Sequence, residues 1–501
     1  MLQAAEAAWK RRDYQQSISI LERASRLAPA DSRLWFYLGR CHGLCYDYAA
    51  AERCFEKAIN NSGRKKEAFM AAGLHCLSFG QHEMAARHFE RTMKQNGDSV
   101  EALVRLAEVR ERQNHLDEAA DLVKRALNLN PNFIPALLTR ARLHRLTDQL
   151  EEAETLLRSF VKKSNADSWT RAQAWYELGS ILDRQQCFDD AMSAFLEAKA
   201  LMPTTAGQNE FRQAAHADLK KNTETISSDL LRRWHEIGET FKPRHRLAVL
   251  CGHPRSGTTL LEQVLDSHPG ILSMEETSIF FEEAFIPLGR DFAPDVHFVP
   301  VLDSIAPGLL RQSRKNYFRC AEHFLGQPIT QRLLLDKNPS LLTLIPAIIR
   351  IFSETKFLVA LRDPRDVCLS CFMQPIFPTN RISSTYPTLE ATAIDYSLTM
   401  NFWQVLKPLM PSPFLEVRYE DLADDVESIA RRILEFLDVP WNDRVLDFQK
   451  HSQNKLVRSP TYADVRKPVT KRAVGRWRNY QKYLEPYLPV LEPFVKAFGY
   501  E

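Results

Sequence analysis

A loop between two apolar segments has the residues and the spacing of a phosphate-binding site. Residues 246–251 form a short apolar run typical of a buried strand, residues 252–259 read GHPRSGTT, and a helical pattern follows. A loop between a strand and a helix N-terminus presents backbone N–H groups to a phosphate. The spacing of Gly252 and Gly257 is that of a P-loop, but Thr258 stands where a nucleoside triphosphatase needs lysine. We therefore expect this loop to bind a ligand with one phosphate at that position.

A second strand-like run, residues 356–361, is followed by the sequence RDPRDVCLS. Together the two motifs resemble those of sulfotransferases, which bind the donor 3′-phosphoadenosine-5′-phosphosulfate. The resemblance implies that Arg362 and Ser370 hold the 3′-phosphate, because an arginine binds two phosphate oxygens at once and a serine hydroxyl adds a donor. It assigns the 5′-phosphosulfate to five residues of the first loop. These are Arg255, Ser256, Gly257, Thr258 and Thr259.

Transfer of a sulfuryl group to a hydroxyl needs a base for the acceptor proton and positive charge near the bridging oxygen. Residues 266–277, DSHPGILSMEET, are similar to a stretch of protein-tyrosine sulfotransferases in which the second glutamate is the base. This similarity implies that Glu276 takes the acceptor proton. Glu275 and His268 remain alternative bases.

Two further strand-like segments carry residues that match the same family. Residues 333–339 read LLLDKNP, and the resemblance implies that Lys337 stabilises charge in the transition state. Residues 414–422 read FLEVRYEDL, and Tyr419 is the residue expected to contact the nucleoside of the donor.

Residues 454–482 contain nine lysines and arginines against one acidic residue. A nucleic-acid interface is one interpretation of such a stretch, but the whole chain has a net charge of only +3. The stretch also resembles the loop that covers the donor in sulfotransferases. That resemblance implies that Ser459 assists at the sulfate, Lys467 closes over the site and Arg476 meets the 3′-phosphate. This sequence departs from the family twice: Arg476 stands in place of lysine, and Gln374 in place of a second arginine for the 3′-phosphate.

The elements before these motifs form an internal repeat over the first two hundred residues. Small residues recur with a step of 34 at Ala5, Gly39, Gly73, Ala107 and Ala141. Each is followed by another small residue after twelve positions and by a larger apolar one after sixteen, and a sixth copy is displaced by four residues. The pattern resembles the tetratricopeptide repeat, in which paired antiparallel helices pack through small residues at their crossing. We expect an all-α solenoid that binds a protein or peptide on its concave face, with an unrelated helical bundle as the alternative.

Composition narrows the class of protein further. The 501 residues are 45% hydrophobic and 26% charged, which excludes disorder of the whole chain. The uncharged apolar run at residues 340–349 is shorter than the roughly 20 residues of a membrane helix. The first residues lack the apolar core of a secretory signal, and nine cysteines form no framework of the secreted type. We therefore expect a cytoplasmic protein without a membrane span, and no metal, because no ligand cluster is apparent.

The predicted organisation has three parts. A tetratricopeptide solenoid of about six repeats occupies residues 1–205, a helical connector residues 206–245, and a P-loop-like α/β sulfotransferase domain with a mainly parallel sheet residues 246–501. The predicted acceptor is a protein tyrosine, because a solenoid raises the local concentration of a polypeptide rather than of a small molecule. A carbohydrate or lipid-linked acceptor is the alternative within the enzyme class. A non-catalytic repeat scaffold is the alternative outside it.

Overall fold

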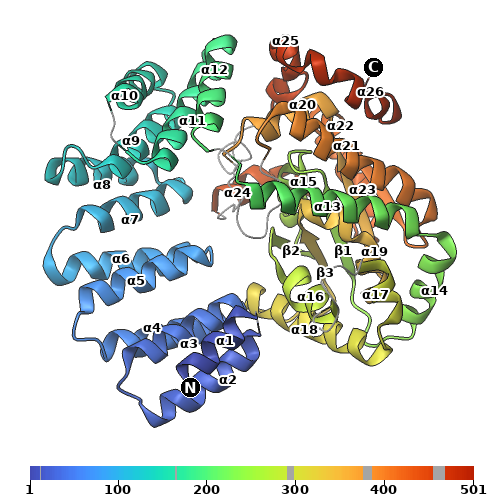
Figure 1. Ribbon diagram of the computed structural model, residues 1–501, viewed down its shortest axis with the longest axis horizontal. Coiled ribbons are helices and arrows are strands. Elements are labelled where there is room, and N and C mark those ends of the chain that lie inside the picture. Colours follow the sequence, from blue (N-terminus) through green and yellow to red (C-terminus); the bar gives the residue numbers. More distant parts are fainter. Residues whose placement is uncertain are drawn as a thin grey trace. The chain divides into compact units, whose positions relative to one another are not determined.

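The computed structural model describes residues 1–11, 13–163, 166–202, 204–289, 298–375, 386–454 and 469–500. Two compact units make up the chain (Figure 1). One consists of Met1–Leu156 with Arg319–Pro328, and the other of Leu157–Phe318 with Ile329–Glu501. No helix within the described ranges combines the length and the apolar character that crossing a lipid bilayer requires.

The first twelve helices of the described chain form six successive pairs joined by short turns (Figure 1). They are α1 (Leu2–Lys10), α2 (Tyr14–Leu27), α3 (Ser32–Leu44), α4 (Tyr48–Asn60), α5 (Lys65–Ser78), α6 (His82–Asn96), α7 (Val100–Arg112), α8 (Leu116–Leu129), α9 (Ile134–Leu146), α10 (Leu150–Lys163), α11 (Ser168–Arg184) and α12 (Phe188–Ala200). The turn inside five of the pairs contains one residue with a positive φ of 64° to 70°: Tyr46, Gly80, Asn114, Asp148 and Gln186. Their recurrence at the repeat step confirms the predicted all-α repeat architecture.

Small residues at the helix crossings make room for a phenylalanine of the same pair. A Cβ atom on Gly39 would lie 2.7 Å from Cε1 of Phe55, and one on Gly73 would lie 2.5 Å from Cε1 of Phe89. Carbon atoms pack at about 3.5–4.0 Å, so the absent side chain lets each ring lie against the first helix. Phe55 also stacks on His75 of the next pair, with ring centroids 5.8 Å apart. The alternation of small and large residues therefore builds both the pair and its contact with the next one.

The second unit contains a parallel sheet, five-stranded in the described residues, with the strand order β2-β3-β1-β4-β5. The strands are β1 (Leu247–Gly252), β2 (Ile271–Glu275), β3 (Leu333–Lys337), β4 (Lys356–Leu361) and β5 (Phe414–Arg418). Every residue of β1, β2 and β3 is buried, as expected for parallel strands covered on both faces. Because the strands all run the same way, their carboxyl ends meet at one edge. The predicted mainly parallel sheet is thus confirmed.

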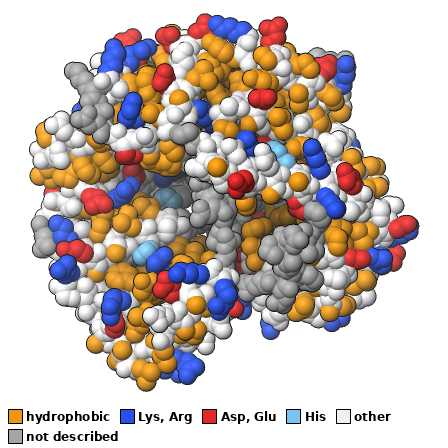
Figure 2. Space-filling view, in the orientation of Figure 1, with side chains coloured by type: hydrophobic (Ala, Val, Ile, Leu, Met, Phe, Trp, Pro, Cys, Tyr) orange, Lys and Arg blue, Asp and Glu red, His pale blue; other side chains and the backbone are white. Residues whose placement is uncertain are grey.

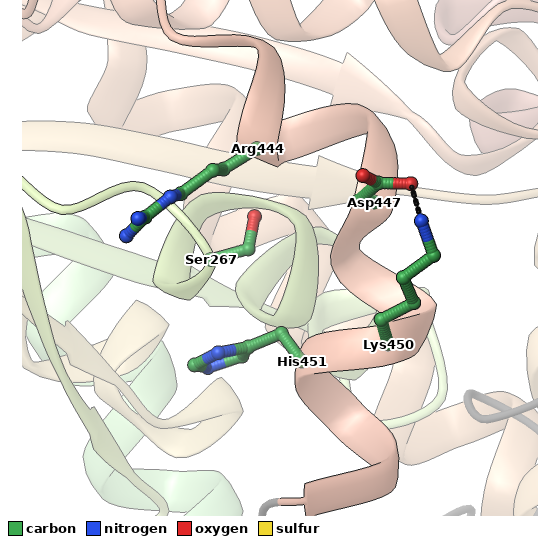
Figure 3. A pocket seen from close by; sticks show the side chains of 5 residues that line it. All are labelled: Ser267, Arg444, Asp447, Lys450 and His451. Carbon is green, nitrogen blue, oxygen red and sulfur yellow. Dashed lines mark hydrogen bonds and ion pairs between the residues drawn. The ribbon is translucent and has the colours of Figure 1, made fainter.

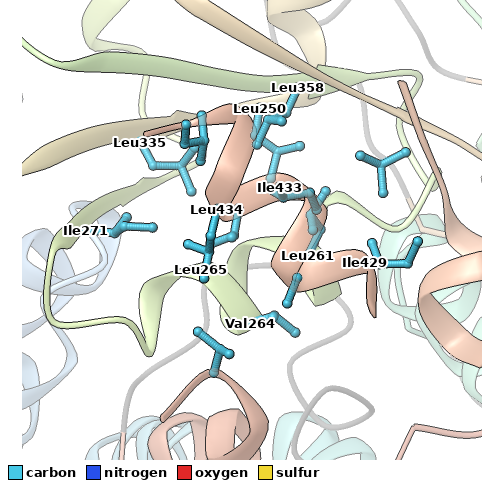
Figure 4. Packing of buried hydrophobic residues seen from close by; sticks show 14 of the residues in the cluster. Leu250, Leu261, Val264, Leu265, Ile271, Leu335, Leu358, Ile429, Ile433 and Leu434 are labelled. Carbon is cyan, nitrogen blue, oxygen red and sulfur yellow. The ribbon is translucent and has the colours of Figure 1, made fainter. Parts of the chain in front are cut away.

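A hydrophobic core fills the space between the sheet and two helices, α15 (Thr258–Asp266) and α23 (Val426–Phe436). In Figure 4, Leu250, Leu335 and Leu358 come from three neighbouring strands, while Val264 and Ile433 come from the helices. All five side chains are fully buried. Complete burial of one such side chain stabilises the fold by about 1.5–3 kcal/mol, so this core holds α15, and with it the loop that precedes α15, against the sheet.

The remaining elements connect the strands or follow them. Helices α13 (Ala206–Thr225) and α14 (Ser228–Glu239) lie between the last repeat and β1. A π-helix, η1 (Phe280–Phe285), follows β2, and the 3₁₀ turns are η2 (Pro339–Leu344), η3 (Lys407–Leu409), η4 (Asp443–Asp447), η5 (Lys471–Ala473), η6 (Arg476–Tyr480) and η7 (Glu485–Tyr487). The other α-helices are α16 (Ile286–Gly289), α17 (Phe298–Ser304), α18 (Pro307–Leu325), α19 (Ile345–Ile351), α20 (Pro364–Phe372), α21 (Leu389–Leu406), α22 (Tyr419–Asp424), α24 (Phe448–Asn454), α25 (Gln481–Leu484) and α26 (Leu488–Ala497).

Candidate active site

Residues from five separate stretches of the chain meet at the carboxyl edge of the sheet. The glycine-bearing loop follows β1, Glu276 follows β2, Lys337 ends β3, Arg362 follows β4 and Tyr419 follows β5. In open parallel sheets, ligands bind at this edge, where the strand order reverses. Here β2 and β3 lie on one side of β1, whereas β4 and β5 lie on its other side. The strand order therefore reverses between the neighbours β1 and β4. The loop and Arg362 therefore flank the point of reversal.

The loop after β1 has a backbone shape that its glycine makes possible. Gly257 caps α15 with a φ of 89°, and a Cβ atom there would lie 2.5 Å from Cδ2 of Tyr419. Arg255 also has a positive φ, 74°. Thr258 and Thr259 begin α15 and are buried, and the first N–H groups of a helix have no partner within the helix itself. This arrangement can present backbone N–H donors to an anion at the N-terminus of α15.

Two arginines and a serine connect this loop with β4 and α20. Nε of Arg255 donates to Oγ of Ser370 over 3.0 Å, and Nη1 of Arg362 donates to the Arg255 carbonyl over 3.1 Å. The Arg362 guanidinium also lies 5.0 Å from the centre of the Tyr419 ring. Arg362 is buried, and its Nε has no hydrogen-bond partner among the described residues. A buried cation with an unsatisfied donor is suited to binding an anion.

A glutamate and a lysine form an ion pair on the other side of the same loop. Nζ of Lys337 lies 2.8 Å from Oε1 of Glu276 and 3.8 Å from Oε1 of Glu275. Lys337 is fully buried, whereas the Glu276 side chain is 33% exposed. Glu276 has a φ of 47°, a backbone conformation that is strained for a residue other than glycine. Its N–H donates to the Lys337 carbonyl over 2.7 Å, which holds the two residues together.

The two alternative bases are held differently. His268 uses both ring nitrogens, because Nε2 lies 2.8 Å from the Pro440 carbonyl and Nδ1 accepts the Gly270 N–H over 2.9 Å. Glu275 is the last residue of β2 and is buried. Among the three candidate bases, Glu276 combines two properties. Its carboxylate lies within hydrogen-bond distance of Lys337, and it is accessible to solvent.

Comparison with known proteins identifies this part of the chain. Residues 248–443 match the Sulfotransferase family, and residues 77–132, 2–42 and 138–206 match the Tetratricopeptide repeat. The matched sulfotransferase residues include the loop, Glu276, Lys337, Arg362 and Tyr419. Residues 248–443 therefore match a sulfotransferase domain.

Individual relatives are distant, and the similarity extends over only part of this chain. An uncharacterized protein of Aquifex aeolicus is 25% identical over 352 residues, which are 68% of this chain but 44% of that protein. Protein-tyrosine sulfotransferase 1 of Danio rerio is 28% identical over 271 residues, or 51% of this chain and 72% of that protein. Among solved structures, the sulfotransferase domain from the Synechococcus PCC 7002 olefin synthase is 21% identical, with a TM-score of 0.37, and covers 51% of this chain and 96% of that domain.

Arg476 begins the 3₁₀ turn η6 of the unit that carries the sulfotransferase domain, and Asp366 of α20 holds the backbone there. The Asp366 carboxylate accepts the Gly475 N–H at Oδ2 over 2.7 Å and the Trp477 N–H at Oδ1 over 2.8 Å. Burial raises the pKa of Asp366 to about 6. The Arg476 guanidinium pairs with Asp183, a residue of α11 for which the sequence offered no motif. Two other predicted residues, Ser459 and Lys467, lie outside the described residues.

A shallow pocket of about 280 Å³ lies elsewhere in the unit that carries the sulfotransferase domain (Figure 3). Its lining residues are Ser267, Arg444, Asp447, Lys450 and His451. Ser267 caps the C-terminus of α15, so this pocket is at the opposite end of that helix from the phosphate loop. None of the predicted site residues lines it. The pocket is therefore separate from the site at the strand ends.

One group of metal-ligating residue types occurs among the described residues. Side-chain ligand atoms of Glu52, Cys76 and His88, in the second and third helix pairs, lie within 4.8 Å of one another. His88 pairs with Glu52 over 3.0 Å, but its Nδ1 has no hydrogen-bond partner among the described residues. A metal-bound histidine almost always donates its other ring N–H to a neighbour, and burial raises the pKa of the Cys76 thiol to about 12. The group contains a pair of buried His88 with part-exposed Glu52, beside the buried Cys76.

Proposed function

We propose that the sulfotransferase domain transfers the sulfuryl group of 3′-phosphoadenosine-5′-phosphosulfate to a hydroxyl acceptor, and that the acceptor is a protein tyrosine. The observation that carries this proposal is the pair of Glu276 and Lys337 beside a phosphate loop. Lys337 lies opposite Leu250 of β1 in the sheet register, two residues before the strand ends at the loop. A proton acceptor and a cation are thus next to the place where a phosphosulfate would bind.

Each residue of this pair has a separate part in the proposed transfer. Glu276 accepts the proton of the acceptor hydroxyl while the hydroxyl oxygen forms its bond to sulfur. The bond between sulfur and the bridging oxygen of the donor breaks, and that oxygen leaves as part of the 5′-phosphate. Lys337 has three N–H donors, so it can hold Glu276 and also stabilise the charge that develops on the leaving oxygen.

The donor would be bound at two places. Residues 255–259 would hold its 5′-phosphosulfate, and Arg362 with Ser370 would hold its 3′-phosphate. Tyr419 would contact the nucleoside, and its ring already packs on the loop at Gly257. Arg476 would meet the 3′-phosphate, Ser459 would assist at the transferring sulfate, and Lys467 would close over the site.

The repeats support a polypeptide acceptor. Large apolar side chains are exposed on the first helices of successive pairs: Tyr37 of α3 is 44% exposed and Leu74 of α5 is 38% exposed. Tyrosine in particular is enriched among the side chains that dominate protein interfaces. A tyrosine acceptor suits a carboxylate base, because a phenol with a pKa near 10 gives up its proton more readily than an aliphatic alcohol.

Transfer of radiolabelled sulfate from the donor to a panel of tyrosine peptides, glycans and lysate proteins tests the proposal. Label in tyrosine peptides is the expected result, and label in glycans alone would replace the protein acceptor by a carbohydrate one. Calorimetric titration with 3′-phosphoadenosine-5′-phosphate tests the non-catalytic scaffold at the same time. Absence of binding at micromolar concentrations would reject the enzyme and favour the scaffold.

A further inference from the structure

The last repeat, α11 with α12, is bonded to the segment that carries Arg476. Asp183 of α11 is buried, and its Oδ1 lies 3.1 Å from Nε and 2.8 Å from Nη2 of Arg476. The same oxygen accepts the Tyr480 hydroxyl over 2.8 Å, and Oδ2 lies 3.7 Å from Arg472. One carboxylate of the repeat region therefore binds three side chains of residues 472–480.

These contacts orient the Arg476 guanidinium. Asp183 takes Nε and Nη2, and Nη2 also lies 3.3 Å from Sδ of Met373, the residue that caps α20. Nη1 has no hydrogen bond to a described residue. A carboxylate on one side of a guanidinium fixes the direction of the remaining donors. The two arginines near Asp183 carry more positive charge than its single carboxylate neutralises.

A second cation of the same repeat reaches the end of α20. Nζ of Lys199, on α12, donates to the Tyr386 carbonyl over 2.6 Å and lies 5.1 Å from the centre of the Phe372 ring. Within the described ranges, no carboxylate forms an ion pair with it. Burial lowers the pKa of Lys199 to about 8, as expected for a cation without a counter-charge. An anion at this place would supply one.

Both cations contact the last turn of α20 and the residue that caps it, just before Gln374 in the sequence. Arg476 contacts Met373 and Lys199 contacts Phe372, and these residues immediately precede Gln374. Ser370, one turn earlier on α20, already receives the Arg255 donor. Two cations from other parts of the chain therefore lie at the C-terminal end of α20, the helix that carries Ser370.

We propose that the sixth repeat forms one side of the donor site, with Asp183 positioning Arg476 and Lys199 supplying a second cation for the 3′-phosphate. This inference rests on the proposed donor. It assigns the sixth repeat a part in donor binding, in addition to any part that it has in binding an acceptor.

The test compares two nucleotides that differ in the 3′-phosphate. The affinities of the full chain for 3′-phosphoadenosine-5′-phosphate and for adenosine 5′-phosphate are measured by calorimetry, and their ratio reports what the 3′-phosphate contributes. Asp183→Asn keeps the shape of the side chain and removes its charge. We expect the ratio of the two affinities to be at least tenfold smaller in this variant than in the wild type. Its affinity for adenosine 5′-phosphate should stay within about twofold of the wild type.

Asp189→Asn is the matched control. Asp189 of α12 makes similar bonds to the C-terminal segment, 2.7 Å to Nζ of Lys482 and 3.1 Å to the Tyr483 hydroxyl, but neither partner is a proposed donor ligand. An unchanged ratio in Asp189→Asn and a reduced one in Asp183→Asn support the positioning role. Equal ratios in Asp183→Asn and the wild type would overturn it. Equal losses in both variants would also overturn it, because they would show a general structural effect.

Lys199→Gln provides an independent measurement if Asp183→Asn does not fold. Glutamine keeps an N–H donor for the Tyr386 carbonyl and removes the charge, so the ratio should again fall at least tenfold. A ratio equal to that of the wild type would remove Lys199 from the site. A wild-type protein that binds both nucleotides equally well would instead contradict the proposed donor, so the two failures can be told apart.

Discussion

Lys337 is a fully buried ammonium group at the end of a central strand, and its nearest carboxylate is the exposed Glu276. A buried charge is tolerated when it is paired, and removal of one partner leaves the other uncompensated. In the proposed transfer the pairing also decides which oxygen would act as the base, because Lys337 contacts Oε1 of Glu276. Among the described residues Oε2 has no such contact, so in the proposed transfer it is the oxygen that would accept the proton.

Glu276→Gln removes the proton acceptor and keeps the size of the side chain. Turnover should fall by about 10²–10⁴-fold, while the affinity for 3′-phosphoadenosine-5′-phosphate stays close to that of the wild type. Steady-state transfer assays and calorimetry measure the two effects. Glu236→Gln, at an exposed glutamate of α14, is the control. Full turnover in Glu276→Gln would transfer the role of base to Glu275 or His268.

Arg362→Ala should weaken binding of 3′-phosphoadenosine-5′-phosphate by about 1.5–3 kcal/mol, the usual contribution of a hydrogen bond to a charged group. Calorimetric titration measures the loss. Arg431→Ala removes an exposed arginine that pairs with Glu427 on α23 and should leave the affinity unchanged. Unchanged affinity in Arg362→Ala would exclude Arg362 from the donor site.

Asp336, next to Lys337 in β3, should make stability depend on pH. Burial raises its pKa from 3.8 to about 7, and one of its oxygens accepts the Tyr317 hydroxyl over 2.8 Å. Between these two pH values the folded protein holds a proton that the unfolded chain has released, so the free energy of unfolding falls as the pH rises. Asp336→Asn has no such proton and should lose less stability between about pH 5 and about pH 8 than the wild type does. Urea unfolding at both pH values checks this, and an equal change in the two proteins would show that Asp336 does not titrate in this range.

At the scale of elements, the sequence predicted the features that are formed by neighbouring stretches of the chain. The phosphate loop lies between a strand and a helix, so its shape follows from local glycine and threonine residues, and the helix pairs follow from a step of 34. Glu276 and Lys337 were predicted through a family resemblance, and the structure shows them paired. Asp183 and Lys199 could not be predicted, because neither has a motif around it. Arg476 lies 293 residues from Asp183, and only the folded chain brings the two together.

The packing of glycine against phenylalanine within a helix pair can be tested by filling the space. Gly73→Leu would place carbon atoms inside the Phe89 ring, because a Cβ alone would lie 2.5 Å from it. We expect a loss of about 1–3 kcal/mol in the free energy of unfolding. Gly63→Leu is the control, since no heavy atom lies within 4 Å of a Cβ there. Chemical denaturation measures both variants, and similar losses in the two would show that the crossing tolerates a larger side chain.

At the scale of the whole molecule, acidic and basic side chains are intermixed on the face shown in Figure 2. This distribution agrees with the net charge of +3. A broad electrostatic attraction for nucleic acid would need positive charge concentrated on a surface. Any selectivity of the repeats for an acceptor would then depend on particular exposed side chains.

The double variant Tyr37→Ala and Leu74→Ala should raise the KM for a protein acceptor about tenfold, the size of effect that one well-buried interface side chain has. The KM for a small phenol should not change, because a small phenol gains nothing from an extended surface. Leu129→Ala, which removes another exposed apolar side chain, is the control. If both acceptors respond equally, these side chains do not dock the protein acceptor.

The separation of Asp183 from Arg476 has a consequence for synthesis of the chain. At about 5–20 residues per second, a ribosome needs on the order of 15–60 s to travel the 293 residues between them. During this interval all six helix pairs have left the ribosome, but the buried Asp183 carboxylate still lacks its arginine and its tyrosine. On the proposed function, a nascent chain would expose its repeats before residues 472–480 complete the donor site. On the proposed function, the surface for an acceptor would thus exist in each molecule before the capacity for transfer does.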